Sequence, residues 1–129
     1  MRDDKGFTLI ELLIVIAIIG IIAGIAVAQL RTAPQKAKEA VLKEDLYAIR
    51  DVIDQYFADK GKYPEALDTL VEEGYLRKIP VDPITNSSET WQTVHAEADD
   101  EDPDASGGII DVKSGADGTA LDGGRYSDW

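Results

Sequence analysis

The chain has 129 residues, which is enough for one small domain with an appendage, since chains of this size usually have a single core. Its formal net charge of -12 argues against DNA or RNA as a direct partner, because nucleic-acid binding depends on basic residues that neutralise phosphates. The sequence contains no cysteine, which excludes disulfides and thiolate chemistry.

A long apolar segment lies near the start of the chain. No charged or strongly polar side chain occurs from Leu12 to Ala28, and with residues 7–10 the stretch reaches the roughly 20 residues that a helix needs to cross a bilayer. A secretory signal peptide would have a small-residue cleavage site after this core, but here the core continues directly into AQLRTAPQKAKEA. We therefore expect a membrane-spanning helix that stays in the mature protein.

The residues before this segment form a specific motif, KGFTLIELL, which starts at Lys5. The motif resembles the class III signal of type IV pilins and of the pseudopilins of type II secretion, and the match is complete. The resemblance implies that a prepilin peptidase cuts between Gly6 and Phe7 and that the new amino group of Phe7 is methylated. Residues 1–6 are then a leader peptide, and Glu11 is the family's acid at the fifth position of the mature chain.

The carboxylate of Glu11 requires an explanation, because an acid in a membrane segment costs a few kcal/mol and is rare without a partner or a function. Cleavage after Gly6 would create a cationic amine at Phe7, and residues four apart share one face of a helix. In the family, the preferred amine belongs to a neighbouring subunit and sets the axial register of a filament. The alternative is a Glu11 that is merely solvated at the headgroup level. We favour an assembly role for Phe7 and Glu11, because the whole motif is present.

A second, amphipathic helical pattern follows up to Lys60. Its apolar residues recur at spacings of three and four, which predicts one buried stripe: Leu42, Leu46, Ile49, Ile53 and Tyr56. Gly61 supplies a stop, so the whole helix should run from about Thr8 to Asp59. Pro34 should kink or interrupt this helix near Leu30.

The next segment predicts a short second helix, which begins after Pro64 and ends at Gly74. Its flanking YP, GYL and PVDP sequences resemble the major pseudopilin of type II secretion. Tyr63 and Tyr75 are interpreted as packing residues rather than ligand contacts. Two β-like runs, ETWQTVHA and GGIIDVK, then predict a small antiparallel sheet, with His95 as a surface or strand residue.

An acidic loop, EADDEDPDASGG, joins the two β-like runs. Its composition is typical of a solvated, mobile loop. A sharper hypothesis is an EF-hand-like calcium loop, although Ala105 stands where such a loop needs glycine. The ligands of that site would be Asp100, Asp102, Asp104 and Asp111.

The C-terminal segment, SGADGTALDGGRYSDW, resembles the terminal loop of the major pseudopilin. In that loop calcium is bound by aspartates and main-chain oxygens, so the resemblance implies a calcium site with Asp117, Asp122 and Asp128. Gly124 and Arg125 stand where the family has a later pair of acids. As an alternative, Arg125 would pair with Asp122 or Asp128 and hold the loop without metal. Burial of the Trp129 ring would anchor the segment in either case.

The expected fold is α+β and pilin-like: a long N-terminal transmembrane and stem helix packed on a small antiparallel sheet, with a short second helix and an ordered C-terminal loop. The predicted organisation is a leader at residues 1–6, a transmembrane polymerisation helix at 7–30, an amphipathic stem helix at 31–60 and a small periplasmic globular region at 61–129.

The sequence contains no nucleophile–base pair in context, phosphate loop or histidine cluster, so we do not expect an enzyme. The resemblance implies a structural subunit of a type II secretion pseudopilus, which is cleaved, methylated and polymerised into a helical filament that drives protein export. It implies as partners further copies of the chain, prepilin peptidase, an assembly platform, minor pseudopilins and inner-membrane lipid. The chain would cross the inner membrane once with its C-terminal region in the periplasm, and later form a periplasmic or extracellular filament.

Two alternatives remain open from the sequence. One is a major pilin of a type IV pilus, used for adhesion or motility. The other is a membrane-tethered periplasmic module that binds calcium or another ligand and never polymerises.

Overall fold

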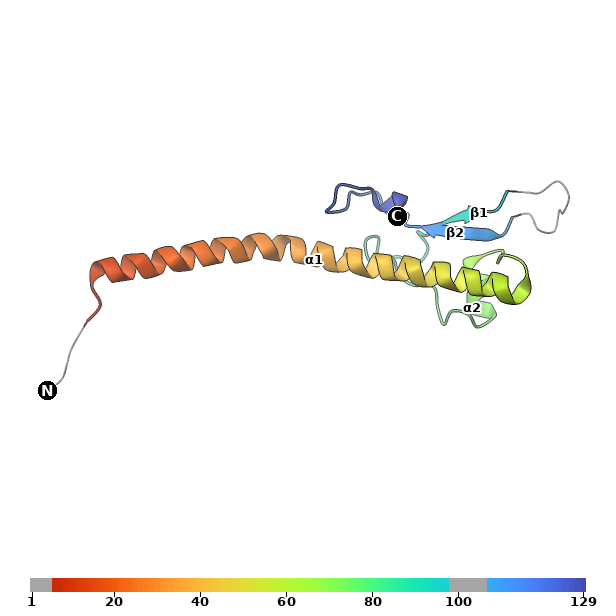
Figure 1. Ribbon diagram of the computed structural model, residues 1–129, viewed down its shortest axis with the longest axis horizontal. Coiled ribbons are helices and arrows are strands. Elements are labelled where there is room, and N and C mark those ends of the chain that lie inside the picture. The colour runs from red at the N-terminus through yellow and green to blue at the C-terminus, as the bar shows by residue number, and fades with distance from the viewer. Residues whose placement is uncertain (1–5, 98–106) are drawn as a thin grey trace. The chain divides into compact units, whose positions relative to one another are not determined.

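The computed structural model describes residues 6–97 and 107–129, and the chain divides into two compact units, Met1–Gln35 and Lys36–Trp129. The elements follow in the order α1 (Leu9–Lys60), α2 (Leu67–Glu72), β1 (Gln92–His95), β2 (Ile109–Lys113) and the 3-10 helix η1 (Tyr126–Asp128), as Figure 1 shows. A long helix, a short helix and a small antiparallel sheet confirm the predicted α+β, pilin-like fold.

Helix α1 begins and ends within one residue of the predicted bounds. Its C-terminal end is formed by Gly61, whose φ of 72° is easily reached only by glycine, and whose N–H donates to the carbonyl of Phe57 at 2.8 Å. Of the predicted kink or interruption near Leu30, the interruption is wrong: Pro34 lies inside one continuous helix. A proline removes one backbone hydrogen bond, and the alanine, glutamine and lysine residues around Pro34 are strong helix formers that maintain the helix on both sides.

The first unit contains the apolar part of α1. It is long and apolar enough to cross a membrane by length and composition, with a mean hydropathy of 3.0 over its most apolar window. None of that window is buried within the single chain. Such a continuous apolar surface is unstable in water, so it requires lipid or the apolar surfaces of other helices around it.

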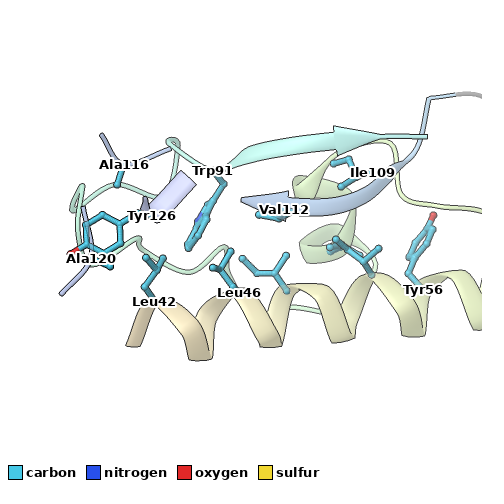
Figure 2. Close-up of a cluster of buried hydrophobic side chains, with 12 residues drawn as sticks. Leu42, Leu46, Tyr56, Trp91, Ile109, Val112, Ala116, Ala120 and Tyr126 are labelled. Carbon is cyan, nitrogen blue, oxygen red and sulfur yellow. The ribbon is translucent and has the colours of Figure 1, made fainter. Parts of the chain in front are cut away.

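The second unit has one hydrophobic core along α1, as Figure 2 shows. The predicted stripe on α1 is confirmed, because all five of its side chains are at most 3% exposed. The residues that cover the stripe come from α2, the sheet and the C-terminal segment: Leu70, Trp91, Ile109, Val112, Ala116, Ala120 and Tyr126. The helical periodicity of α1 therefore specifies where the rest of this unit packs.

Helix α2 follows a turn after α1 and places Leu70 in the core with no exposed surface. Gly74 ends this region with a φ of 83°. The predicted packing roles of the two tyrosines agree with their contacts. Tyr63 stacks on Phe57 at 4.4 Å between ring centroids, and Tyr75 meets Tyr56 edge-on at 5.2 Å.

Strands β1 and β2 pair in antiparallel register, with Gln92 opposite Lys113 and an irregularity between Val94 and His95. Trp91 comes directly before β1 and is 8% exposed, and its indole N–H donates to the carbonyl of Pro80 at 2.8 Å. The predicted sheet is thus confirmed. Residues 98–106, which hold Asp100, Asp102 and Asp104 of the hypothetical EF-hand-like loop, lie outside the described residues.

Candidate functional site

The first candidate site is the start of α1, where the predicted cut lies between Gly6 and Phe7. The side chain of Phe7 is 89% exposed, and a Cβ added at Gly6 would meet no atom within 4 Å. Both residues at the predicted cut are therefore exposed. The structure places Glu11 in the first turn of α1, four residues after Phe7.

Glu11 takes part in a capping box that sequence reasoning missed. The backbone N–H of Thr8 donates to Glu11 Oε2 at 3.4 Å, and the backbone N–H of Glu11 donates to Thr8 Oγ1 at 3.3 Å. The spacing of threonine and glutamate in TLIE is the sequence signature of this motif. In the uncut chain the carboxylate therefore already has a local partner at the positive end of the helix dipole.

The second candidate site is the segment after β2, which contains the three aspartates of the predicted calcium site. All three are exposed. Asp117 lines a small pocket together with Arg125, Asp122 Oδ1 accepts a hydrogen bond from the Gly124 N–H at 2.9 Å, and Asp128 belongs to η1. Across residues 6–97 and 107–129, no three side chains of histidine, cysteine, aspartate or glutamate come together as metal ligands.

The C-terminal segment is instead contacted by a glutamate of α1. Glu39 is 9% exposed, and its Oε1 accepts hydrogen bonds from the Leu121 N–H and the Tyr126 hydroxyl, both at 2.8 Å. Sequence reasoning missed this residue, because its partners lie more than 80 residues further along the chain. The only local signal was an acid one turn before the buried stripe of α1.

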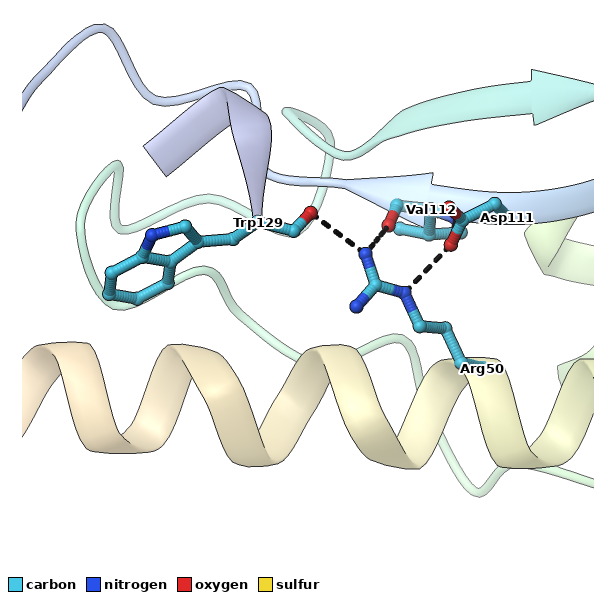
Figure 3. A network of polar contacts seen from close by, with 4 residues as sticks. All are labelled: Arg50, Asp111, Val112 and Trp129. Atoms are coloured by element: carbon cyan, nitrogen blue, oxygen red, sulfur yellow. Dashed lines mark hydrogen bonds and ion pairs between the residues drawn. The ribbon is translucent and has the colours of Figure 1, made fainter. Parts of the chain in front are cut away.

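Arg50 of α1 holds the end of the segment, as Figure 3 shows. One guanidinium nitrogen, Nη2, donates to the carbonyls of Val112 and Trp129 at 2.9 and 2.8 Å. Its Nε donates to Asp111 Oδ1 at 2.7 Å, which is also an ion pair. Asp111 therefore serves as a partner of Arg50 on β2. Within the described part of the chain, Arg125 forms no ion pair with Asp122 or Asp128, so the arginine predicted to hold the loop is not the one that does so.

The anchoring role predicted for Trp129 agrees with its contacts. Its ring is partly buried against the core, meets Tyr126 edge-on at 5.3 Å between centroids, and lies 4.6 Å from the ammonium of Lys43. A cation over an indole face is attracted by the ring quadrupole. Lys43 thus adds a third α1 side chain to those that hold the segment.

His95, the single histidine, is exposed at the end of β1. Its ring nitrogens lie 3.1 Å from Thr93 Oγ1 and 2.6 Å from the carbonyl oxygen of Gly107. It takes part in no metal-ligand group of the described residues, and these contacts agree with the strand-surface interpretation.

A buried carboxylate contacts the residue that follows β2. Asp82 has no exposed surface, and it accepts hydrogen bonds from the Ile84 N–H at 2.8 Å and from the Ser114 hydroxyl at 2.5 Å. Burial raises the pKa of the nearby Asp45 on α1, and the charges of Asp82 and Glu44 raise it further. Asp82 therefore fixes a turn, which explains the acid in the PVDP sequence. Its negative charge also makes ionisation of Asp45 on α1 less favourable.

The fold and the N-terminal motif together define a pilin-like protein with an apolar N-terminal helix. The prokaryotic N-terminal methylation motif matches residues 1–27. The chain is 39% identical to the type II secretion system core protein G of Pseudomonas aeruginosa over 101 residues, which cover 66% of this chain and 71% of that protein.

Similar relatives occur in other bacteria. The core protein G of Escherichia coli K12 is 34% identical over 99 residues, which cover 64% of this chain and 68% of that protein. The core protein G of Vibrio cholerae is 33% identical, and the match covers 67% of this chain and 69% of that protein. No solved structure matches the chain. The chain therefore belongs to the type II secretion system core protein G family, the G-type major pseudopilins.

Proposed function

We propose that the chain is the precursor of a structural, non-enzymatic subunit that polymerises into the helical pseudopilus of a type II secretion system and drives protein export. Prepilin peptidase cuts between Gly6 and Phe7, and the new amine of Phe7 is methylated. The mature subunit crosses the inner membrane once, with its globular unit in the periplasm, until an assembly platform and minor pseudopilins add it to the filament.

The observation that carries this proposal is the combination of the methylation motif with an apolar helix that stays uncovered in the single chain. A membrane anchor alone needs only apolar length. The motif adds a cleavage site and an acid in the first helical turn, which an anchor does not need. A bundle of such helices from many copies would bury the apolar surface that lipid covers before assembly.

Glu11 has a defined role in this proposal. Its carboxylate accepts the methylated amine of Phe7 from the neighbouring subunit, and a charge pair in an apolar surrounding is favourable only when the geometry is good. The pair therefore favours one axial position of the incoming subunit over others. The capping box with Thr8 holds the carboxylate at the helix start until that amine arrives.

Assembly is tested with Glu11→Ala in a reconstituted secretion system. We expect filaments to be lost, since the amine of the next subunit has no acceptor, while the amount of processed protein in the membrane stays unchanged. Glu44→Ala, which removes an exposed acid further along α1, serves as the charge-matched control and should still assemble. Normal filaments from Glu11→Ala would refute the role of this acid.

Processing is tested by mass spectrometry of the membrane-bound and filament forms. The expected mature chain starts at methylated Phe7. Filaments made from chains that still carry residues 1–6 would refute the cleavage step. Normal processing with no filaments under any condition would instead favour a tethered periplasmic module.

A further inference from the structure

The side chains around the predicted calcium site supply few of the ligands that this ion requires. Calcium takes six to eight oxygen ligands, among which carboxylates supply the charge. The pocket beside Asp117 is also lined by Arg125, whose positive charge opposes a bound cation. Asp122 already accepts a backbone hydrogen bond, and no group of three potential ligand side chains forms among the residues that the structure describes.

The segment is nevertheless fixed by hydrogen bonds to α1. At Glu39 its groups act as donors to a carboxylate, whereas around a cation they would act as oxygen ligands. A cation gathers carbonyl and carboxylate oxygens around itself. Glu39 gathers donors: the Leu121 N–H and the Tyr126 O–H both point at one of its oxygens at 2.8 Å. An acceptor on α1 therefore supplies the fixed charge at this point.

A second contact fixes the end of the segment from the same side of α1. Glu39 and Arg50 are about three helical turns apart, so they lie on one face. Arg50 donates to the carbonyl of Trp129 at 2.8 Å, and Lys43, between the two, lies over the Trp129 ring. Tyr126 and Trp129 pack edge-on in the interval. An acid, a cation–π pair and an arginine thus hold the segment at three successive points.

We infer that the C-terminal segment of this pseudopilin is ordered by Glu39, Lys43 and Arg50 of α1 in place of a structural divalent cation. The inference concerns the order of the globular unit and does not depend on filament formation. Glu39 is a positioning residue, because its buried carboxylate binds the Leu121 N–H and the Tyr126 hydroxyl, which precede Trp129 in the chain.

The first test uses the full chain in detergent, unfolded by heat with either excess CaCl2 or excess EGTA. A structural ion present at 100-fold over its Kd would raise the Tm of a domain of this size by roughly 10–20 °C. We expect the two Tm values to agree within about 1 °C. A Tm that falls by several degrees in EGTA and recovers on addition of CaCl2 would overturn the inference.

The second test measures hydrogen–deuterium exchange of peptides from residues 116–129. Glu39→Ala should accelerate exchange most at the Leu121 amide, because this N–H loses its acceptor. The Tyr126 amide donates to the Gly118 carbonyl, so it should exchange faster only because loss of the Tyr126 hydroxyl contact loosens this part of the segment. Glu39→Gln keeps a carbonyl oxygen at the same place and should preserve most of the protection, even if the alanine variant does not fold. Glu44→Ala is the control that removes an exposed acid of the same helix.

The outcomes separate the two explanations. Protection that is equal in CaCl2 and EGTA, and that is lost in Glu39→Ala but kept in Glu39→Gln, supports the inference. Protection in the wild-type chain that depends on CaCl2 overturns it. A Glu39→Gln variant with exchange as fast as an unfolded peptide also overturns it, because an acceptor at this position would then not be sufficient.

Discussion

Replacement of Arg50 by alanine tests the contact that ties α1 to both β2 and the end of the C-terminal segment. The guanidinium reaches three groups that are between 61 and 79 residues away along the chain. Its loss leaves the carbonyls of Val112 and Trp129 without this donor. We therefore expect Arg50→Ala to destabilise the globular unit as a whole and to loosen the end of the segment most.

The magnitude follows from the exposure of the groups. The ion pair with Asp111 joins side chains that are 37% and 38% exposed, so solvent screening limits it to about 0–1 kcal/mol. The two hydrogen bonds to carbonyls are part-buried and contribute about 1 kcal/mol each. Together they amount to about 2–3 kcal/mol, which corresponds to a Tm lower by roughly 10–20 °C for a unit of this size.

The assay is thermal unfolding of the full chain in detergent, followed by near-UV circular dichroism. Asp111→Asn is the matched variant, since it removes the ion pair but keeps an oxygen acceptor, and it should lower the free energy of unfolding by no more than about 1 kcal/mol. Two results would refute this reasoning. One is an Arg50→Ala protein with the Tm of the wild type, and the other is an Asp111→Asn protein as unstable as Arg50→Ala.

Two further predictions concern pH. Burial and the charges of Asp82 and Glu44 raise the pKa of Asp45 above its usual 3.8. The folded state therefore favours the protonated carboxyl, and the stability that this gives is complete below pH 3.8 and is lost as the pH rises through the folded-state pKa. Asp45→Asn should therefore have a higher Tm than the wild type at pH 7, and an equal or lower Tm would contradict the direction. The hydrogen bond to the Asp59 carboxylate, followed by burial, raises the pKa of Tyr75 from 10.0 to about 12. Its contribution is complete below pH 10 and lost as the pH approaches 12, so the Tm difference between wild type and Tyr75→Phe should shrink over that range; a constant difference would count against it.

The elements that the sequence predicted well are those with local causes. The buried stripe of α1 follows from side chains three and four residues apart, and the helix end follows from the conformational freedom of Gly61. Both depend on residues within a few turns of each other. The antiparallel pairing of β1 and β2 was predictable for a similar reason, since two β-like runs joined by one loop have few other ways to pair.

The contacts that sequence reasoning missed are between residues far apart in the chain. Nothing near Glu39 or Arg50 shows that their partners lie in the C-terminal segment, because a charged residue beside an apolar stripe is usually solvated. The interruption predicted at Pro34 failed for the opposite reason, since a local rule was overruled by favourable helix formers on both sides. The capping box at Thr8 is different, because the T-x-x-E spacing of residues 8–11 is a local sequence signature of this motif.

Glu39 and Glu11 of α1 differ in how firmly their hydrogen-bond partners are held. Glu39 is buried, and it accepts hydrogen bonds of 2.8 Å from Leu121 and from Tyr126. A competing donor would have to break these hydrogen bonds and would itself lose its hydration. Glu11 is exposed, and the two bonds of its capping box are 3.3 and 3.4 Å long, beyond the usual distance for an N–H donor. An approaching amine would therefore replace a weak contact of Glu11 with a charge-assisted one, which is stronger in an apolar surrounding. In the uncut precursor the carboxylate of Glu11 is thus held at the helix start by bonds that an amine can readily replace. This supports the proposed order, in which cleavage comes first and pairing with a neighbouring subunit second.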